Sequence, residues 1–212
     1  PDLASAFEVS EDQKIYTFTL RDGARWHDGQ AVRAADIVFT IQAIQSPLYR
    51  SRLSASFADV QAVEVDERTV QFTLSEPFAP FLSSLTLGIL PSHLWQEIAP
   101  KTAPLAALNL EPVGSGPMRF EKFTRDKRGV IRSFSLVPNK DFYGTRVLLE
   151  RITFKFYPDA GAAVQALKNR NVEGLGFVPA DRQTEVENER GVVLLRPNMP
   201  RASVLFFQPT NA

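Results

Sequence analysis

The sequence lacks cysteine, holds only two histidines and carries no excess charge, since 24 Lys and Arg residues balance 24 Asp and Glu residues. Without cysteine there is no disulfide, thiolate nucleophile or zinc–thiolate site, and the chain is compatible with either side of a bacterial membrane. A net charge of zero provides no field that would attract nucleic acid or anionic lipid. Partners must therefore be inferred from specific sites.

Long apolar runs are also missing. The longest apolar stretches, such as residues 85–91 and 204–207, fall far short of the roughly 20 residues that a membrane-spanning helix needs. The chain begins at Pro1 without the basic and apolar segments of a signal peptide, so any targeting peptide is expected to lie outside this sequence or not to exist. By contrast, 44% of the 212 residues are hydrophobic and 16 are Phe, which is enough to fill a globular core.

Motifs for catalysis, metal ions and nucleotides are scarce. His27 lies in a Trp-His-Asp-Gly turn and His93 near a predicted helix start, and neither has a second ligand at helical or hairpin spacing. An anchored loop residue is the preferred interpretation of His27 over a catalytic one. Gly114 and Gly116 lack the third glycine of a dinucleotide site and the Lys-Ser/Thr of a P-loop, so they are expected to serve backbone geometry. The sequence predicts no catalytic residue, no metal site and no cofactor.

Periodicity predicts a strand, a helix and a hairpin in the first part of the chain. Residues 15–20 alternate large apolar side chains with Thr and end at an Asp-Gly turn. Isoleucines at helical spacing predict a helix over residues 34–46. Residues 60–65 and 69–74 alternate as a hairpin, and a short helix is expected to run from the Pro-Ser pair at residue 91 to residue 98.

The character of the sequence changes near residue 109, where we place a subdomain boundary. Strands and helices alternate in the last third, which predicts an α/β fold class with a mixed sheet covered by helices. The expected division is a smaller α+β subdomain, residues 1–108, and an α/β subdomain, residues 109–212. Strands are expected at residues 118–123, 130–137, 152–156, 174–178, 192–195 and 204–207, and helices at 160–169 and 181–189.

A series of segments spread over the chain occurs in the order found in one known family. The most recognisable is YTFTLRDGARWHDG at residues 16–29. The others are LASAFEVSED at 3–12, AADIVF at 34–39, VQFTL at 70–74, EPFAPFL at 76–82, ILPSHL at 89–94, PVGSGP at 112–117 and PNKDFYG at 138–144. Together these segments resemble the family 5 extracellular solute-binding proteins, the group that contains the dipeptide-, oligopeptide- and nickel-binding receptors of ABC importers.

The resemblance implies a lobe of the kind found in type II periplasmic binding proteins, and it covers only part of the family's length. The chain is therefore expected to be a piece of the first lobe of a longer receptor. Ligand binding in the cleft between two lobes, followed by hinge closure, would present the closed form to the ABC permease of the inner membrane.

The ligand that the resemblance implies is a di- or oligopeptide held in an extended conformation by main-chain hydrogen bonds. The implied location is the periplasm or the outer face of the cytoplasmic membrane, with membrane association only through an anchor outside this sequence. Enzyme activity and nucleic-acid binding are not implied.

By analogy with peptide-binding relatives, a loop after a short predicted strand and a strand on the hinge side are expected to face the ligand. Their residues are Phe177, Val178, Pro179 and Ala180 in the loop, and Ser203, Val204, Leu205 and Phe206 in the strand. In an alternative interpretation, Phe177, Leu205 and Phe206 belong to the core. Arg33 stands where relatives carry Thr or Ser, so the helix that follows is expected to lack a side-chain cap.

Three other functions are compatible with the sequence. The same fold hosts receptors for non-peptide ligands, such as a nickel chelate, haem or an oligosaccharide. A hydrolase lobe is another alternative, although no nucleophile in the chain has a nearby His, Asp or Glu partner. A pure interaction domain would expose a large apolar patch in the intact protein.

Overall fold

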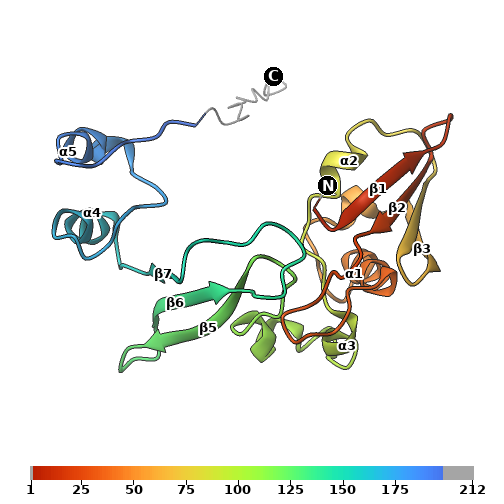
Figure 1. Cartoon of the computed structure of the whole chain (residues 1–212), viewed down its shortest axis with the longest axis horizontal. Coiled ribbons are helices and arrows are strands. Elements are labelled where there is room, and N and C mark those ends of the chain that lie inside the picture. Colours follow the sequence, from red (N-terminus) through yellow and green to blue (C-terminus); the bar gives the residue numbers. More distant parts are fainter. Residues whose placement is uncertain (1, 198–212) are drawn as a thin grey trace, which may run out of the picture. The chain divides into compact units, whose positions relative to one another are not determined.

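The computed structural model describes residues 2–197 (Figure 1). The chain divides into two compact units, Pro1–Phe154 and Lys155–Ala212. Strands and helices both occur in the described part, which confirms the predicted α/β class. No helix between residues 2 and 197 has the length and apolar character that crossing a membrane would require.

The first unit contains a four-stranded sheet built from β1 (Ala4–Val9), β2 (Ile15–Leu20), β3 (Val60–Asp66) and β4 (Thr69–Leu74). The strand order is β1-β2-β4-β3, and every neighbouring pair is antiparallel. Tyr16, Leu20, Val70 and Phe72 project from the central strands into the core and are at most 5% exposed. The period of two that predicts β2 and β4 is therefore the period with which these strands bury one face, whereas only Val60 of β3 is buried.

Helix α1 (Ala34–Gln45) packs on this buried face (Figure 1). Ile37, Ile41 and Ile44 recur at helical spacing and are all buried in the core. Arg33 makes no side-chain cap hydrogen bond, as expected. Instead, Asp36 in the first turn accepts a hydrogen bond from the backbone N–H of Arg33, the residue before the helix, at 2.9 Å.

An aromatic cluster closes the core of this sheet. The one-turn helix α2 (Phe81–Ser84) begins after two prolines and inserts Phe81, which is 1% exposed. The Phe81 ring lies 4.9 Å from Tyr16 and 5.6 Å from Phe72, centroid to centroid, at the tilted angles that aromatic pairs favour. The other short helices of the unit are η1 (Ser54–Phe57), α3 (Ser92–Trp95), η2 (Ala103–Leu105) and η3 (Ala107–Asn109).

A second, three-stranded sheet follows, with β5 (Met118–Arg125), β6 (Ile131–Pro138) and β7 (Ile152–Lys155) in that spatial order. The β5–β6 pair is an antiparallel hairpin. Two ion pairs add to this sheet. Arg151, just before β7, donates to both oxygens of Glu121 in β5, and Arg132 in β6 donates twice to Oδ2 of Asp126 in the hairpin turn. The predicted boundary near residue 109 falls between the two sheets. The division into two subdomains at this boundary remains a prediction.

The described part of the second unit, residues 155–197, contains three short helices and a small core. Its helices are α4 (Ala160–Lys168), η4 (Ala180–Arg182) and α5 (Gln183–Glu187). The side chain of Asp159 caps α4 by accepting from the Ala162 N–H at 2.8 Å. Val164, Leu167 and Val186 form the core, which is small because each helix offers only one or two turns to bury.

Two strands predicted in this unit are wrong. Residues 174–178 and 192–195 have no strand in the structure. An extended segment becomes a strand only when a neighbour satisfies its backbone groups, and no strand of residues 155–197 other than the end of β7 is present to do so. The helix expected over residues 181–189 begins as η4 and ends at Glu187, and the helix expected to reach residue 98 ends at Trp95. The strand expected at residues 204–207 lies outside the described residues.

Candidate functional site

The loop predicted to face the ligand places its four residues in different surroundings. Phe177 is 80% exposed, whereas Val178 packs against the core of the second unit. Pro179 precedes η4 with an extended backbone, and Ala180 is the first residue of that turn. The alternative that Phe177 is a core residue does not hold in this unit. The other predicted residues, Ser203, Val204, Leu205 and Phe206, lie outside the described part of the chain.

Backbone and ion-pair contacts hold this loop from its C-terminal side. The Arg182 N–H donates to the carbonyl of Pro179 at 3.0 Å. Glu185 receives Lys168 at 3.1 Å and Arg182 at 3.2 Å, which ties α5 to α4. The hydrogen bond from Lys168, followed by the one from Arg182, lowers the pKa of Glu185. An exposed aromatic ring therefore projects from a loop whose following turn is anchored, an arrangement suited to contacting a second surface.

The Trp-His-Asp-Gly turn forms a second cluster, because the His27 ring is held between two backbone groups of the loop at residues 112–117. Nδ1 accepts from the Gly114 N–H at 3.1 Å, and Nε2 lies 3.0 Å from the Gly116 carbonyl oxygen. Since a carbonyl only accepts, Nε2 carries the proton and the imidazole is neutral. Burial is the main cause that lowers the pKa of His27. A Cβ on Gly114 would lie 3.3 Å from the His27 ring, so glycine permits the close approach.

Asp36, which is hydrogen-bonded to the neighbouring Trp26, is a buried carboxylate with four hydrogen bonds. It is 3% exposed, and it accepts from the Trp26 indole N–H at 3.1 Å and the Arg33 N–H at 2.9 Å. The backbone N–H and the hydroxyl of Ser92 donate to its other oxygen at 2.8 and 2.6 Å. Asp36 thereby joins the turn, the start of α1 and the start of α3.

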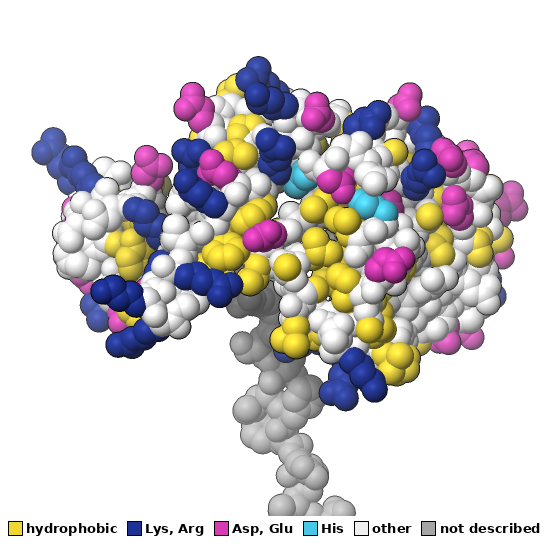
Figure 2. All heavy atoms as spheres, turned by 90° about the horizontal axis from the view of Figure 1, so that it is seen from below, with side chains coloured by type: hydrophobic (Ala, Val, Ile, Leu, Met, Phe, Trp, Pro, Cys, Tyr) yellow, Lys and Arg dark blue, Asp and Glu magenta, His cyan; other side chains and the backbone are white. Residues whose placement is uncertain are grey.

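A histidine–carboxylate pair borders the same cluster. His93 Nε2 lies 2.7 Å from Asp28 Oδ2. Burial of Asp28 disfavours its ionised form, but the hydrogen bonds from His93 and from the Gln30 N–H outweigh burial and lower the pKa of Asp28. Figure 2 shows both histidines, in cyan, reaching the surface of this face.

Taken together, the cluster has a structural role. Asn139 adds a further bond to the Gly116 carbonyl at 3.2 Å, so segments from residues 26, 36, 92, 114 and 139 meet here through satisfied donors and acceptors. Between residues 2 and 197, no buried side-chain nitrogen or oxygen lacks a hydrogen-bond partner, and no three His, Asp or Glu side chains are grouped to hold a metal ion. The segments at residues 16–29, 112–117 and 138–144 therefore help to hold the fold together.

Sequence reasoning missed the role of Asp36 and Asn139. A signal existed for Asp36, because an acidic residue three positions after a helix cap often accepts from the cap backbone. No comparable local signal pointed to Asn139, whose partner lies 23 residues away along the chain.

The family model of bacterial extracellular solute-binding proteins, family 5 middle, matches residues 1–212. The chain belongs to this family. The dipeptide-binding protein of Escherichia coli K12 is 30% identical to it over 203 residues, which cover 85% of this chain and 37% of that protein. The ordered segments from residue 3 to residue 144 thus predicted the family correctly.

Two solved structures share the fold of this family 5 chain. NikZ from Campylobacter jejuni, in complex with Ni(L-His), has a TM-score of 0.78 and 29% identity over 90% of this chain and 37% of NikZ. AgaA from A. tumefaciens R10, in complex with agropinic acid, has a TM-score of 0.76 and 31% identity over 88% of this chain and 36% of AgaA. The chain spans about a third of the length of the relatives it matches. The family is one of solute-binding receptors rather than enzymes.

Proposed function

We propose that this chain is part of one lobe of the extracytoplasmic solute-binding component of an ABC importer, which binds di- or oligopeptides between two lobes and delivers them to the permease. The observation that carries the proposal is membership of family 5 over all 212 residues. The identity of 30% to a dipeptide-binding protein favours a peptide ligand. In this proposal the chain has no catalytic residue and no cofactor, and residues 1–108 and 109–212 are its two subdomains.

Within this function, we infer that Phe177, Val178, Pro179 and Ala180 contact the ligand, with Ser203, Val204, Leu205 and Phe206 completing the surface. The support is the 80% exposure of Phe177 on a loop that the Pro179–Arg182 bond anchors. An aromatic ring held at such a position offers a large contact area at a low cost in side-chain entropy.

Replacing Phe177 with alanine in the intact receptor is expected to weaken peptide binding about five- to tenfold, because the ring supplies apolar contact in the closed cleft. Isothermal titration calorimetry measures the affinity. Thermal unfolding is expected to stay unchanged, because the ring adds nothing to the core. Phe78→Ala is the matched control, since Phe78 is also exposed, at 46%, and lies in the other unit. Equal affinities of the two variants would contradict the assignment of Phe177.

Native mass spectrometry of the intact receptor, purified from its own host, is expected to reveal a co-purified mass that matches a di- or oligopeptide. Family receptors enclose their ligand, so the complex should survive purification. The 212-residue chain alone serves as the control and should carry no such mass, because the enclosing contacts of the other lobe are absent. A bound mass that matches no peptide would contradict the proposed ligand, and turnover of peptides by the intact receptor would contradict a receptor without catalysis.

A non-peptide ligand is the second candidate, favoured by the two solved structures described above. One holds a nickel–histidine complex and the other agropinic acid. The same mass spectrum separates these ligands from peptides and from haem or an oligosaccharide. A nickel isotope pattern, or the mass of agropinic acid, would select this candidate.

A further inference from the structure

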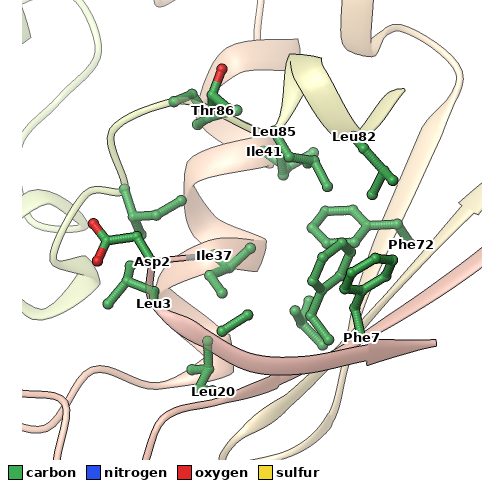
Figure 3. A pocket seen from close by; sticks show the side chains of 15 residues that line it. Asp2, Leu3, Phe7, Leu20, Ile37, Ile41, Phe72, Leu82, Leu85 and Thr86 are labelled. Carbon is green, nitrogen blue, oxygen red and sulfur yellow. The ribbon is translucent and has the colours of Figure 1, made fainter. Parts of the chain in front are cut away.

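An apolar cavity of about 570 Å³ lies in the first unit, between the four-stranded sheet and helix α1 (Figure 3). Its volume falls in the range typical of small-molecule sites. Three phenylalanines of the sheet form one wall and aliphatic side chains of α1 and the segment after α2 form the other. The residues that set these walls are Phe7, Phe18, Phe72, Ile37, Ile41 and Leu85.

The aromatic wall has a defined geometry. Phe7 stacks on Phe18 with ring centroids 5.6 Å apart, and Phe18 meets Phe72 edge to face at 5.7 Å. Phe7 is 44% exposed and Leu82 is 40% exposed, so these two side chains border an opening to solvent. A planar ring entering there would meet ring faces and edges on one side and branched aliphatic groups on the other.

The polar groups at the edge of the cavity are already engaged. Tyr143 donates its hydroxyl to Asp2 at 3.0 Å, and burial followed by this bond raises the pKa of Tyr143 to about 12. Arg21 donates to the Asp2 carbonyl at 2.7 Å, and the Thr86 hydroxyl donates to the Ser83 carbonyl at 2.7 Å. An anionic ligand group would lose its water and would be repelled by the Asp2 carboxylate at the edge of the cavity, which disfavours anionic ligands.

We propose that this cavity binds a neutral, largely hydrocarbon molecule that carries an aromatic ring. Its walls are apolar, and apolar cavities of this kind take up small apolar molecules because water gains little from entering them. The site lies wholly within residues 2–89 and is distinct from the loop at residues 177–180 proposed to contact peptide. It therefore does not depend on the identity of the imported solute.

Titration of the 212-residue chain with the neutral fluorophore N-phenyl-1-naphthylamine tests the proposal. A saturable rise in fluorescence with one site per chain is expected. Ala4→Leu should weaken the binding about tenfold or more, since its added carbons enter the cavity. Ala6→Leu is the matched control, because Ala6 lies on the same strand but is exposed and outside the lining. If Ala4→Leu fails to fold by circular dichroism, Leu85→Phe provides the same test.

Four outcomes would overturn the proposal, and the fourth is displacement by peptide. The first three are an unsaturable signal from the wild-type chain, equal binding by the Ala4→Leu and Ala6→Leu variants, and loss of the signal in the intact receptor, which would mean that another part of the receptor fills the cavity. Saturating peptide added to the intact receptor should leave the fluorescence unchanged. Displacement by peptide would place the fluorophore in the interlobe cleft, which overturns the cavity site and leaves the proposed function standing.

Discussion

Replacing Asp36 with alanine is expected to lower the free energy of unfolding by about 3–5 kcal/mol, because several buried donors lose their acceptor at once. The carboxylate takes hydrogen bonds from the Trp26 indole, the Arg33 N–H and both donors of Ser92. Alanine is too small to replace it, and the 3% exposure of Asp36 leaves little access for water to take its place. Urea denaturation of the chain, followed by circular dichroism, measures the loss.

The matched control for this prediction is Asp59→Ala, since Asp59 is exposed and its removal should change stability by less than about 0.5 kcal/mol. Asp36→Asn should fall between the two, because the amide keeps one acceptor oxygen but turns an N–H₂ group toward the remaining donors. Equal denaturation midpoints for Asp36→Ala and Asp59→Ala would show that the four hydrogen bonds add no net stability.

The sequence was most informative where structure is set by neighbouring residues. Alternation and helical spacing predicted β2, the β3–β4 hairpin and α1 to within a residue or two. β2, β4 and α1 each bury one face against the same core, whereas β3 buries only Val60 and pairs with β4. The absent Thr or Ser at Arg33 correctly predicted a helix without a side-chain cap. Short apolar runs were less informative, because a run such as residues 174–178 becomes a strand only beside a partner that its own sequence does not supply.

In the candidate site, too, the sequence predicted local features but not the contacts between distant segments. Local pattern indicated that His27 sits in an anchored turn, but the anchor itself is Gly114, 87 residues away. Likewise, Ser92 reaches Asp36 over 56 residues. Such pairings depend on how the segments pack, which neither periodicity nor turn chemistry encodes. The exposure of Phe177 also follows from packing, since an apolar residue next to Val178 reads from sequence as a core position as readily as a surface one.

Acidification is expected to destabilise the first unit through His27. The folded pKa of this imidazole is below its usual value, mainly because of burial, and Arg119 adds to the decrease while Asp28 opposes it. The unfolded chain therefore binds the proton more readily than the folded one. Proton linkage therefore sets how His27 affects the free energy of unfolding. Its stabilising contribution is fully present above an unfolded pKa of about 6.5 and is lost as the pH falls through the folded pKa. Unfolding in urea between about pH 8 and pH 5 measures this loss.

Two variants isolate the imidazole from the carboxylates that also titrate in acid. His27→Gln keeps one acceptor and one donor without a titrating group, so the difference between wild type and this variant should shrink on acidification. His27→Ala is expected to lose about 2 kcal/mol at neutral pH, because the Gly114 N–H and the Gly116 carbonyl each lose a partner. His93→Gln controls for the other histidine.

Protonation of His27 at Nδ1 would set two N–H groups against each other at 3.1 Å, so the loop at residues 112–117 should separate from the turn as the ring becomes charged. A wild-type pH profile parallel to that of His27→Gln would show that the ring accepts its second proton without breaking the contact to Gly114.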